Sequence, residues 1–178
     1  MRAPHLLLSS RTRINLSRPS RQFSSSPALL ARNRIYPARV RNEQDLHTLI
    51  LSSASSRVPL ITLWMTTWSR DCDEISPIIR ELIEHDGVGE DKGSVSFAEV
   101  EMDSPDLGGV SSGISQRYMI NSVPTLLAFD RQEPQIETKV AGLEELKSRE
   151  FLKTWIEKEA ARHGTGGAGG KFFGLLGR

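Results

Sequence analysis

The chain has 178 residues, of which 38% are hydrophobic and 25% are charged. This length and composition are typical of a globular protein with one domain of ordinary size plus extensions. No run of about 18 apolar residues is present, so we expect no membrane-spanning helix. Cys72 is the only cysteine, which excludes an internal disulfide and a metal cluster built from cysteines.

The formal net charge of +1 hides a strong asymmetry along the chain. Residues 1–42 contain nine Arg and no Lys, Asp or Glu, whereas residues 43–178 carry 14 basic and 22 acidic residues, a net charge of −8. A basic, Ser-rich and acid-free N-terminus is typical of a mitochondrial targeting segment. We therefore expect residues 1–32 to be such a segment, and the mature protein to lie in the mitochondrial matrix.

The expected cleavage site lies near Phe23–Ser24, because Arg21 precedes Phe23 by two residues, as at matrix-processing sites. Two other interpretations of this N-terminus are weaker. A basic arm that binds nucleic acid is disfavoured because the segment has no Lys and a single aromatic residue, so we expect no nucleic-acid partner. A secretory signal is disfavoured because Leu6–Leu8 is too short for its apolar core.

Hydrophobic periodicity and turn signals predict one domain over residues 33–163. The first strand is a short edge strand, because Pro37 interrupts it and lacks a ladder donor. Asn42 is a good N-cap for the first helix. The stretch VPLITLWM is an unbroken apolar run, which predicts a central strand buried on both faces. In chain order the predicted elements are strand 35–40, helix 43–55, strand 58–65, helix 70–86 with Pro77 inside it, strand 94–103, helix 115–120, strand 122–130, strand 136–140 and helix 143–164.

This order of elements predicts the fold class. Strand–helix–strand units need parallel strands with right-handed crossovers, and the two late strands joined by a short turn add an antiparallel edge. The fold class is therefore α/β, with a central mixed sheet of about five strands and helices on both faces. Residues 164–178 form a Gly-rich linker and the apolar tail KFFGLLGR, which is either a disordered end or a peptide that docks on a partner or a membrane surface.

The stretch WSRDC carries the first part of a family resemblance. An apolar strand leads directly into Trp68, Cys72 follows four residues later, and Pro77 lies five residues beyond Cys72. The motif Val123-Pro124-Thr125 then opens a later strand. In this order and on these elements the motifs are specific, and residues 34–162 resemble the thioredoxin family. The resemblance implies the thioredoxin fold, with a cis peptide bond before the proline of the later motif.

The resemblance also implies a binding site. In the family, the residues that correspond to Trp68, Val123, Pro124 and Thr125 border a groove in which the backbone before the proline pairs with bound peptide in a strand-like way. A protein or peptide partner is therefore expected at these residues.

Three positions depart from the family's pattern. Ser69 stands where the family has its first cysteine, and Leu63 stands where the family has a buried acid. Glu99 stands where the family has a lysine, if Asp103 is the aspartate that ends the third strand. Thiol–disulfide exchange starts with a thiolate at a helix N-terminus and needs a second thiol to resolve the mixed disulfide. Dithiol oxidoreductase activity is therefore not expected.

The two residues at the thiol positions have other interpretations. Ser69 is expected to cap the helix that begins at Arg70. Cys72 is either an inert core residue or a slow monothiol that accepts glutathione or forms a mixed disulfide. Arg70 would favour its thiolate, whereas Asp71 and Asp73 would oppose it.

The remaining polar residues indicate no metal site and no cofactor. Four acids are expected on an exposed strand edge and a loop: Glu99, Glu101, Asp103 and Asp106. Three histidines are expected to be solvated rather than to act as ligands: His47, His85 and His163.

Two functional hypotheses follow. In the first, a mitochondrial thioredoxin-fold protein with a degraded site, Ser69 to Cys72, binds a protein partner and has little or no redox activity. In the alternative, the protein is a monothiol redox protein that acts through Cys72, with glutathione or a partner's cysteine completing the cycle. The missing first thiol, Leu63 and Glu99 favour the first hypothesis.

Overall fold

The computed structural model describes residues 32–109 and 112–164. The predicted targeting segment, its cleavage site near Phe23–Ser24 and the tail KFFGLLGR lie outside the described residues, so these expectations stay predictions. Within the described part of the chain, no helix is both long enough and apolar enough to cross a membrane.

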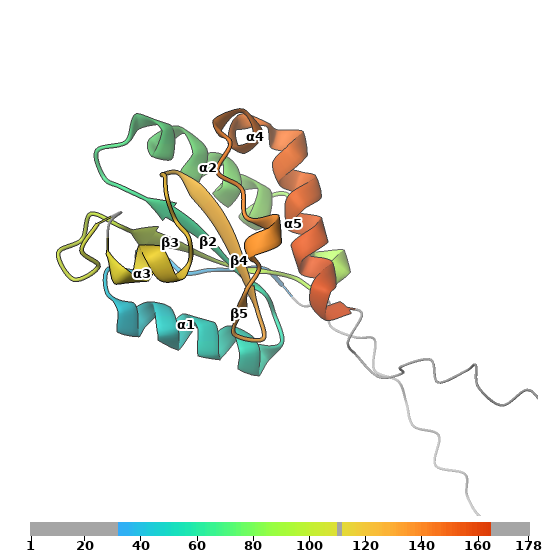
Figure 1. Cartoon of the computed structure of the whole chain (residues 1–178). Helices are drawn as coiled ribbons and strands as arrows, with labels where there is room; N and C mark the ends of the chain where they lie inside the picture. Colours follow the sequence, from blue (N-terminus) through green and yellow to red (C-terminus); the bar gives the residue numbers. More distant parts are fainter. Residues whose placement is uncertain (1–31, 110–111, 165–178) are drawn as a thin grey trace, which may run out of the picture.

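A mixed sheet of five strands forms the middle of the domain (Figure 1). Strands β1, β3 and β2 run parallel, β4 runs antiparallel to β2, and β5 runs antiparallel to β4. This confirms the predicted α/β class with a parallel centre and an antiparallel edge. In their order across the sheet, the strands are β1 (Arg34–Ile35), β3 (Ser96–Glu101), β2 (Leu60–Met65), β4 (Thr125–Asp130) and β5 (Glu133–Pro134).

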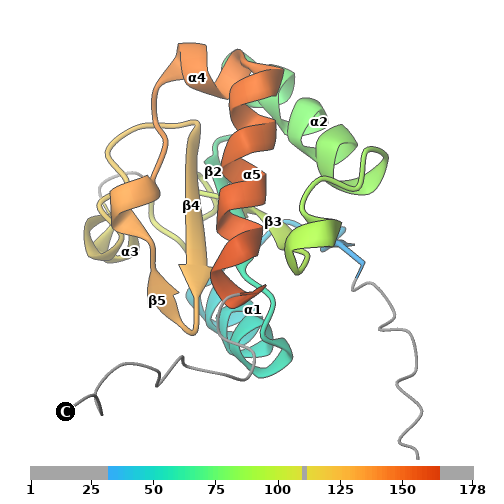
Figure 2. The same cartoon turned by 90° about the vertical axis from the view of Figure 1, so that its right-hand side faces the viewer.

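Helices cover both faces of this sheet, and each face has its own apolar cluster (Figures 1 and 2). Helices α2, α4 and α5 pack on one face, and α1 and α3 pack on the other. Two short 3-10 turns, Glu90–Lys92 and Ile136–Thr138, lie in the connections. The helices are α1 (Glu43–Ser56), α2 (Arg70–Glu84), α3 (Gly113–Arg117), α4 (Leu143–Lys147) and α5 (Arg149–Gly164).

Strand β2 contributes to both clusters. All six of its residues are buried. Leu63 and Met65 belong to the cluster beneath α2 and α5, whereas Leu60 and Trp64 belong to the cluster beneath α1 and α3. Successive side chains of a strand point to opposite faces, so a strand covered on both sides needs an unbroken apolar sequence. The predicted central strand is therefore confirmed, but it begins at Leu60 rather than at Val58.

The N-terminal strand is interrupted at Pro37, as predicted. After β1 the chain leaves the sheet and returns at Val40, whose N–H donates to the Glu99 carbonyl at 2.8 Å and whose carbonyl accepts from the Glu101 N–H at 2.9 Å. The segment from Arg34 to Val40 therefore lies along β3, which makes β3 an interior strand.

The predicted helix 143–164 is two helices. Ser148 adopts an extended conformation, with a ψ of 109°, and its hydroxyl accepts a hydrogen bond from the Phe151 N–H at 3.3 Å. Ser148 thus ends α4 and caps α5. The apolar spacing on either side of it continues, which is why periodicity alone predicted a single helix.

The predicted strand 136–140 is also wrong in its bounds. The strand that pairs with β4 comes earlier, at Glu133–Pro134, and within 136–140 Val140 alone bridges to β4, at Leu126. The β4–β5 turn places Arg131 and Gln132 at positive φ values of 51° and 73°. Two-residue hairpins usually have Asn-Gly there, so Arg-Gln gave no turn signal.

Asn33 fixes the start of the domain. Its amide donates to the carbonyls of Ile83 at 3.0 Å and Val88 at 2.9 Å, and its side-chain oxygen accepts from the Val95 N–H at 2.9 Å. These bonds join the N-terminal segment to the end of α2 and to the chain that enters β3. A processed N-terminus that leaves the fold intact therefore precedes Asn33.

We expect Asn33→Ala to lower the free energy of unfolding by about 2 kcal/mol, because it leaves two carbonyls and one N–H without their partner. Urea denaturation of the full chain measures this change. Asn121→Ala, at an exposed asparagine, is the matched control and is expected to change stability by less than about 0.5 kcal/mol. Equal effects of the two substitutions would contradict the role given to Asn33.

Candidate functional site

Strand pairing brings the two sequence motifs to one edge of the sheet. Trp64 of β2 pairs with Thr125 of β4 in antiparallel register. The chain that leaves β2 toward Trp68 and the Val123-Pro124 segment that enters β4 therefore lie at the same edge. The peptide bond between Val123 and Pro124 is cis, as the motif predicts.

The residues at this edge differ in their exposure. Trp68 is 75% exposed, whereas Val123 is half-buried and Pro124 is buried. Thr125 is also buried, and its hydroxyl donates to the Ser122 carbonyl at 2.7 Å. Of the four residues predicted to bind a partner, Trp68 is exposed and Val123 is partly accessible, while Thr125 supports the turn before β4.

Asp103 holds the loop in front of Trp68. Its carboxylate accepts hydrogen bonds from the Thr67 N–H, at 2.9 Å, and from the Thr67 hydroxyl. Burial alone raises the pKa of Asp103, but the two hydrogen bonds from Thr67 outweigh it, so the pKa of Asp103 lies below its ordinary value. The loop is thus anchored by an ionised carboxylate at neutral pH, one residue before the exposed indole.

Ser69 occupies the N-cap position of α2, but its side chain makes no capping hydrogen bond. The predicted capping role of the hydroxyl is therefore wrong. The Ser69 carbonyl instead accepts from the N–H groups of Cys72 at 3.1 Å and Asp73 at 3.3 Å, so the backbone begins the helix. A helix can start this way because the N-cap carbonyl accepts the first intrahelical bonds whatever its side chain does.

Cys72 lies one turn into α2 and is wholly buried. It belongs to the apolar cluster that also contains Leu63, Met65 and Ile75. Its sulfur therefore faces the core, away from any disulfide in solution. This burial favours the interpretation of Cys72 as a core residue.

The two other departures from the family's pattern lie side by side. Leu63 of β2 and Glu99 of β3 are partners in the parallel ladder. Leu63 is wholly buried and Glu99 is 2% exposed. The Glu99 carboxylate accepts hydrogen bonds from Arg80 at 2.8 Å and Arg39 at 3.1 Å, and from the Ser76 hydroxyl.

These contacts set the ionisation state of Glu99. Burial alone raises the pKa of Glu99, but the hydrogen bonds from Arg80 and Ser76, and the positive charge of Arg80, outweigh it. The pKa of Glu99 therefore lies below its ordinary value. One carboxylate oxygen accepts from Arg80 and Ser76, and the other accepts from Arg39.

The expectation that Glu99 and Glu101 lie on an exposed strand edge is wrong. Glu101 is 8% exposed, and its carboxylate lies 3.3 Å from Arg41 and 3.6 Å from Arg39. The reason is that residues 34–41 cover the outer edge of β3 and bring both arginines with them. Of the other two acids, Asp106 is exposed, as expected, and Asp103 is partly buried.

The first turns of α2 are tied to α4. The Lys147 ammonium lies 2.9 Å from Asp71 and 3.2 Å from Glu74, and Arg70 donates to Glu74 at 3.2 Å. Because all four side chains are at least one-third exposed, these pairs stabilise the fold little. They do fix α4 beside the start of α2, at the same edge as Trp68.

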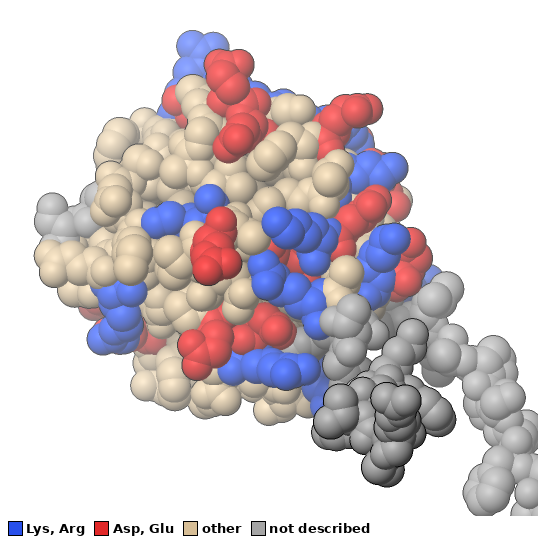
Figure 3. Space-filling model, turned by 45° about the vertical axis from the view of Figure 1, so that its right-hand side comes forward, with Lys and Arg blue, Asp and Glu red and all other residues tan. Residues whose placement is uncertain are grey.

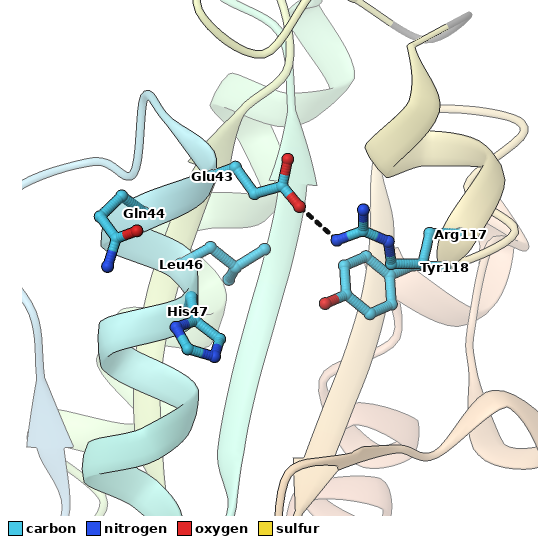
Figure 4. Close-up of a pocket in the computed structure, with 6 residues that line it drawn as sticks. All are labelled: Glu43, Gln44, Leu46, His47, Arg117 and Tyr118. Carbon is cyan, nitrogen blue, oxygen red and sulfur yellow. Dashed lines mark hydrogen bonds and ion pairs between the residues drawn. The ribbon is translucent and has the colours of Figure 1, made fainter.

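A shallow hollow of about 420 Å³ lies elsewhere, between α1 and α3 (Figure 4). An ion pair between Glu43 and Arg117 spans it, and His47 lies exposed on its α1 side. His85 is exposed as well, and the side chain of His163 is not among those described. Within residues 32–109 and 112–164, no three His, Cys, Asp or Glu side chains are grouped so that they would hold a metal ion.

Met119 has a backbone conformation that the sequence did not reveal. It lies in the loop that leads from α3 to Val123, has a positive φ of 53°, and is 54% exposed. Its carbonyl accepts a hydrogen bond from the Lys139 ammonium. The stretch SQRYMI had predicted a helix through this residue, whereas α3 ends at Arg117. A positive φ at a methionine has no sequence signal that could have shown this.

Comparison with known proteins identifies the fold. Thioredoxin O1 from Arabidopsis thaliana is 23% identical, with a TM-score of 0.50 over 71% of this chain and 97% of that one. A Schistosoma mansoni thioredoxin pre-protein is 21% identical, with the same TM-score and coverage. Zinc-bound human ERp44 is 21% identical, with a TM-score of 0.51 over 71% of this chain and 31% of that one. The sequence itself matches no family model and no curated protein. The domain therefore has the thioredoxin fold.

The pH dependence of stability tests the buried state of Glu99. A carboxylate whose folded pKa is lowered stabilises the fold above its unfolded pKa of about 4.3, and this contribution is lost as the pH falls through the folded value. We expect Glu99→Ala to lower the free energy of unfolding by about 2 kcal/mol at pH 7. The cost is limited to this size because the two arginine partners are partly exposed and regain water. At pH 3 the cost should be smaller, because the contribution of the ionised carboxylate is being lost. Urea denaturation at pH 7, 5, 4 and 3 measures both effects.

Glu84→Ala removes an exposed glutamate from the same helix that carries Ser76 and Arg80 and serves as the control. It is expected to change stability by less than about 0.5 kcal/mol at every pH. A pH-independent cost for Glu99→Ala would contradict an ionised Glu99 in the fold.

Proposed function

We propose that this chain is a mitochondrial thioredoxin-fold protein that binds a protein partner at the edge formed by Trp68, Val123 and Pro124, and that it carries out no dithiol exchange. We call these three residues the Trp68 surface. The observation that carries the proposal is the contrast at the start of α2, where Trp68 is 75% exposed and Cys72 is wholly buried.

The chain lacks the chemical groups that the steps of dithiol exchange require. Ser69 supplies no thiolate at the helix N-terminus, and no second cysteine exists to resolve a mixed disulfide. A leucine, Leu63, stands where the family has its buried acid. The nearest buried carboxylate, Glu99, is held in its ionised form by two arginines and a serine. The proposal therefore assigns the site to binding.

An exposed tryptophan supports that assignment. Tryptophan is among the residues that most often dominate binding energy in protein interfaces, because its large ring buries much apolar area at a low cost in entropy. The Trp68 loop is also rigidly anchored through Thr67 and Asp103. An anchored aromatic side chain in solvent is pre-organised for a partner.

The monothiol alternative rests on the place of Cys72, three residues into α2. For its sulfur to meet glutathione or a partner's disulfide, the first turn of α2 has to open. The pairs that join Lys147 to Asp71 and Glu74 oppose this opening only weakly, because they are exposed. The rate of alkylation separates the two hypotheses.

We expect Cys72 in the native full chain to react with iodoacetamide only as fast as the protein unfolds, because the sulfur is buried. The rate is measured from pH 6 to 10, in buffer and in urea, by mass spectrometry of the alkylated chain. A fast native reaction with a midpoint clearly below about 8.5 would instead establish an activated monothiol.

Ser69→Cys is expected to give partial activity in the dithiothreitol-driven reduction of insulin, because it restores a thiol at the helix N-terminus but leaves Leu63 without a proton acceptor. The double variant Ser69→Cys/Cys72→Ser is the control and should lack turnover, since it cannot resolve a mixed disulfide. Complete inactivity of the single variant would mean that a substrate disulfide cannot reach position 69 at this edge of the sheet.

The mitochondrial part of the proposal rests on the acid-free N-terminus. N-terminal sequencing of the protein purified from mitochondria should find a mature end between Ser24 and Asn33. The mature N-terminus should not lie beyond Asn33, because the hydrogen bonds of the Asn33 amide hold the start of the domain. An intact Met1 would contradict mitochondrial processing.

The binding part is tested with a phage-displayed library of random 12-residue peptides, selected on the immobilised full chain. We expect enrichment of peptides that bind the wild-type chain and lose binding to Trp68→Ala. Peptides that bind both chains equally, or no enrichment, would overturn the proposed binding surface.

A further inference from the structure

The sulfur atoms of the domain differ in their access to solvent. Besides Cys72, the described part of the chain contains three methionines: Met65 of β2, Met102 directly after β3, and Met119 in the loop after α3. Met65, Met102 and Cys72 are wholly buried, whereas Met119 is 54% exposed. Within residues 32–109 and 112–164, Met119 therefore carries the one sulfur atom that a small molecule in solution reaches without opening the fold.

The apolar core does not include the Met119 side chain, which belongs to neither of the two clusters that pack on the sheet. The φ of Met119 is 53°, in the left-handed region that glycine adopts more easily than methionine. The Lys139 ammonium donates a hydrogen bond to the Met119 carbonyl, so a backbone contact secures this turn. A polar group at the end of this side chain would therefore stay in water and would not be forced into the core.

The charges on the face of the molecule drawn in Figure 3 are mixed. Lys and Arg side chains lie there among Asp and Glu side chains, and no large area has a single sign (Figure 3). Such a surface does not concentrate a ligand of either charge. A small neutral molecule needs no charged patch, and hydrogen peroxide is a neutral oxidant that converts an exposed methionine to its sulfoxide.

We propose that Met119 is a modification site of the native protein, at which hydrogen peroxide oxidises the thioether to the sulfoxide while Met65, Met102 and Cys72 stay unchanged. The Met119 sulfur attacks one peroxide oxygen, so that an S–O bond forms and the O–O bond breaks. Sulfur loses two electrons to the peroxide, and the leaving hydroxide takes the proton of the transferred oxygen and departs as water. Methionine sulfoxide reductases reverse the change: two thiols are oxidised to a disulfide and the sulfoxide oxygen leaves as water.

This inference goes beyond the binding of a partner proposed above and does not rest on it. It assigns the oxidant sensitivity of the folded domain to a thioether in the loop between α3 and β4. The family that the chain resembles has its reactive thiols at the start of α2 instead, where this chain has Ser69 and the buried Cys72. The same loop continues to Val123 of the Trp68 surface, so the sulfoxide adds a polar group to the segment that leads there.

Treatment of the native full chain with graded hydrogen peroxide, followed by peptide mapping with mass spectrometry, tests the inference. We expect Met119 to gain one oxygen at least about ten-fold faster than Met65 and Met102, because buried side chains react only in the small fraction of molecules that are open. In concentrated urea the three methionines should react at similar rates. Similar rates in the native chain, or oxidation of Cys72 before Met119, would overturn the proposed site.

Two further measurements identify the reacting group and its cost to the fold. A thioether has no proton to lose, so the rate should be the same at pH 6 and pH 8, whereas the oxidation of a thiol rises with its thiolate fraction. The melting temperature of the oxidised chain should stay within about 2 °C of the untreated chain. A larger fall would show that the fold uses the Met119 side chain, which would overturn the inference.

Met119→Leu is the matched variant, because it keeps an apolar side chain of similar size without the sulfur. At the peroxide dose that oxidises the wild-type chain, no residue of the described domain should gain oxygen in this variant. Oxidation of Met65, Met102 or Cys72 in its place would contradict the assignment to Met119. None of these outcomes bears on Trp68, so failure here leaves the proposed binding surface standing.

Discussion

The buried Glu99 carboxylate joins three parts of the domain that are distant in sequence. Arg39 reaches it from the N-terminal segment, Arg80 and Ser76 reach it from α2, and its backbone belongs to the interior strand β3. A buried carboxylate is tolerated only when its charge is matched and its oxygens are hydrogen-bonded, and both conditions hold here. The position of α2, and with it the places of Trp68 and Cys72, depends on this interaction.

The same interaction shows how the core accommodates two residues that depart from the family's pattern. The family that this chain resembles has a buried acid at the position of Leu63 and a lysine at the position of Glu99. In this chain the two residues are partners in adjacent strands. Leu63 fills the space in the core, and the arginines bound to Glu99 compensate the charge of its carboxylate. The Glu99 charge thus takes part in ion pairs that hold β3 to α2 and to the N-terminal segment.

The central strand and the cis proline were predictable because their signals are local: an unbroken apolar run and a Val-Pro-Thr motif. The burial of Glu99 was not predictable, since it depends on Arg39 and Arg80, which lie sixty residues before it and nineteen residues before it in the chain. The break at Ser148 and the Arg131-Gln132 turn were missed because nothing in their neighbours marks them. Met119 was missed because a positive φ at methionine has no sequence signal.

These misses share a physical cause that bears on function. Periodicity and capping rules describe what a sequence favours, whereas strain at Met119 and exposure of Trp68 run against those preferences. The Trp68 side chain, exposed on a loop that Asp103 holds in place, gains apolar burial when a partner covers it. In the function proposed above, a protein partner provides that cover.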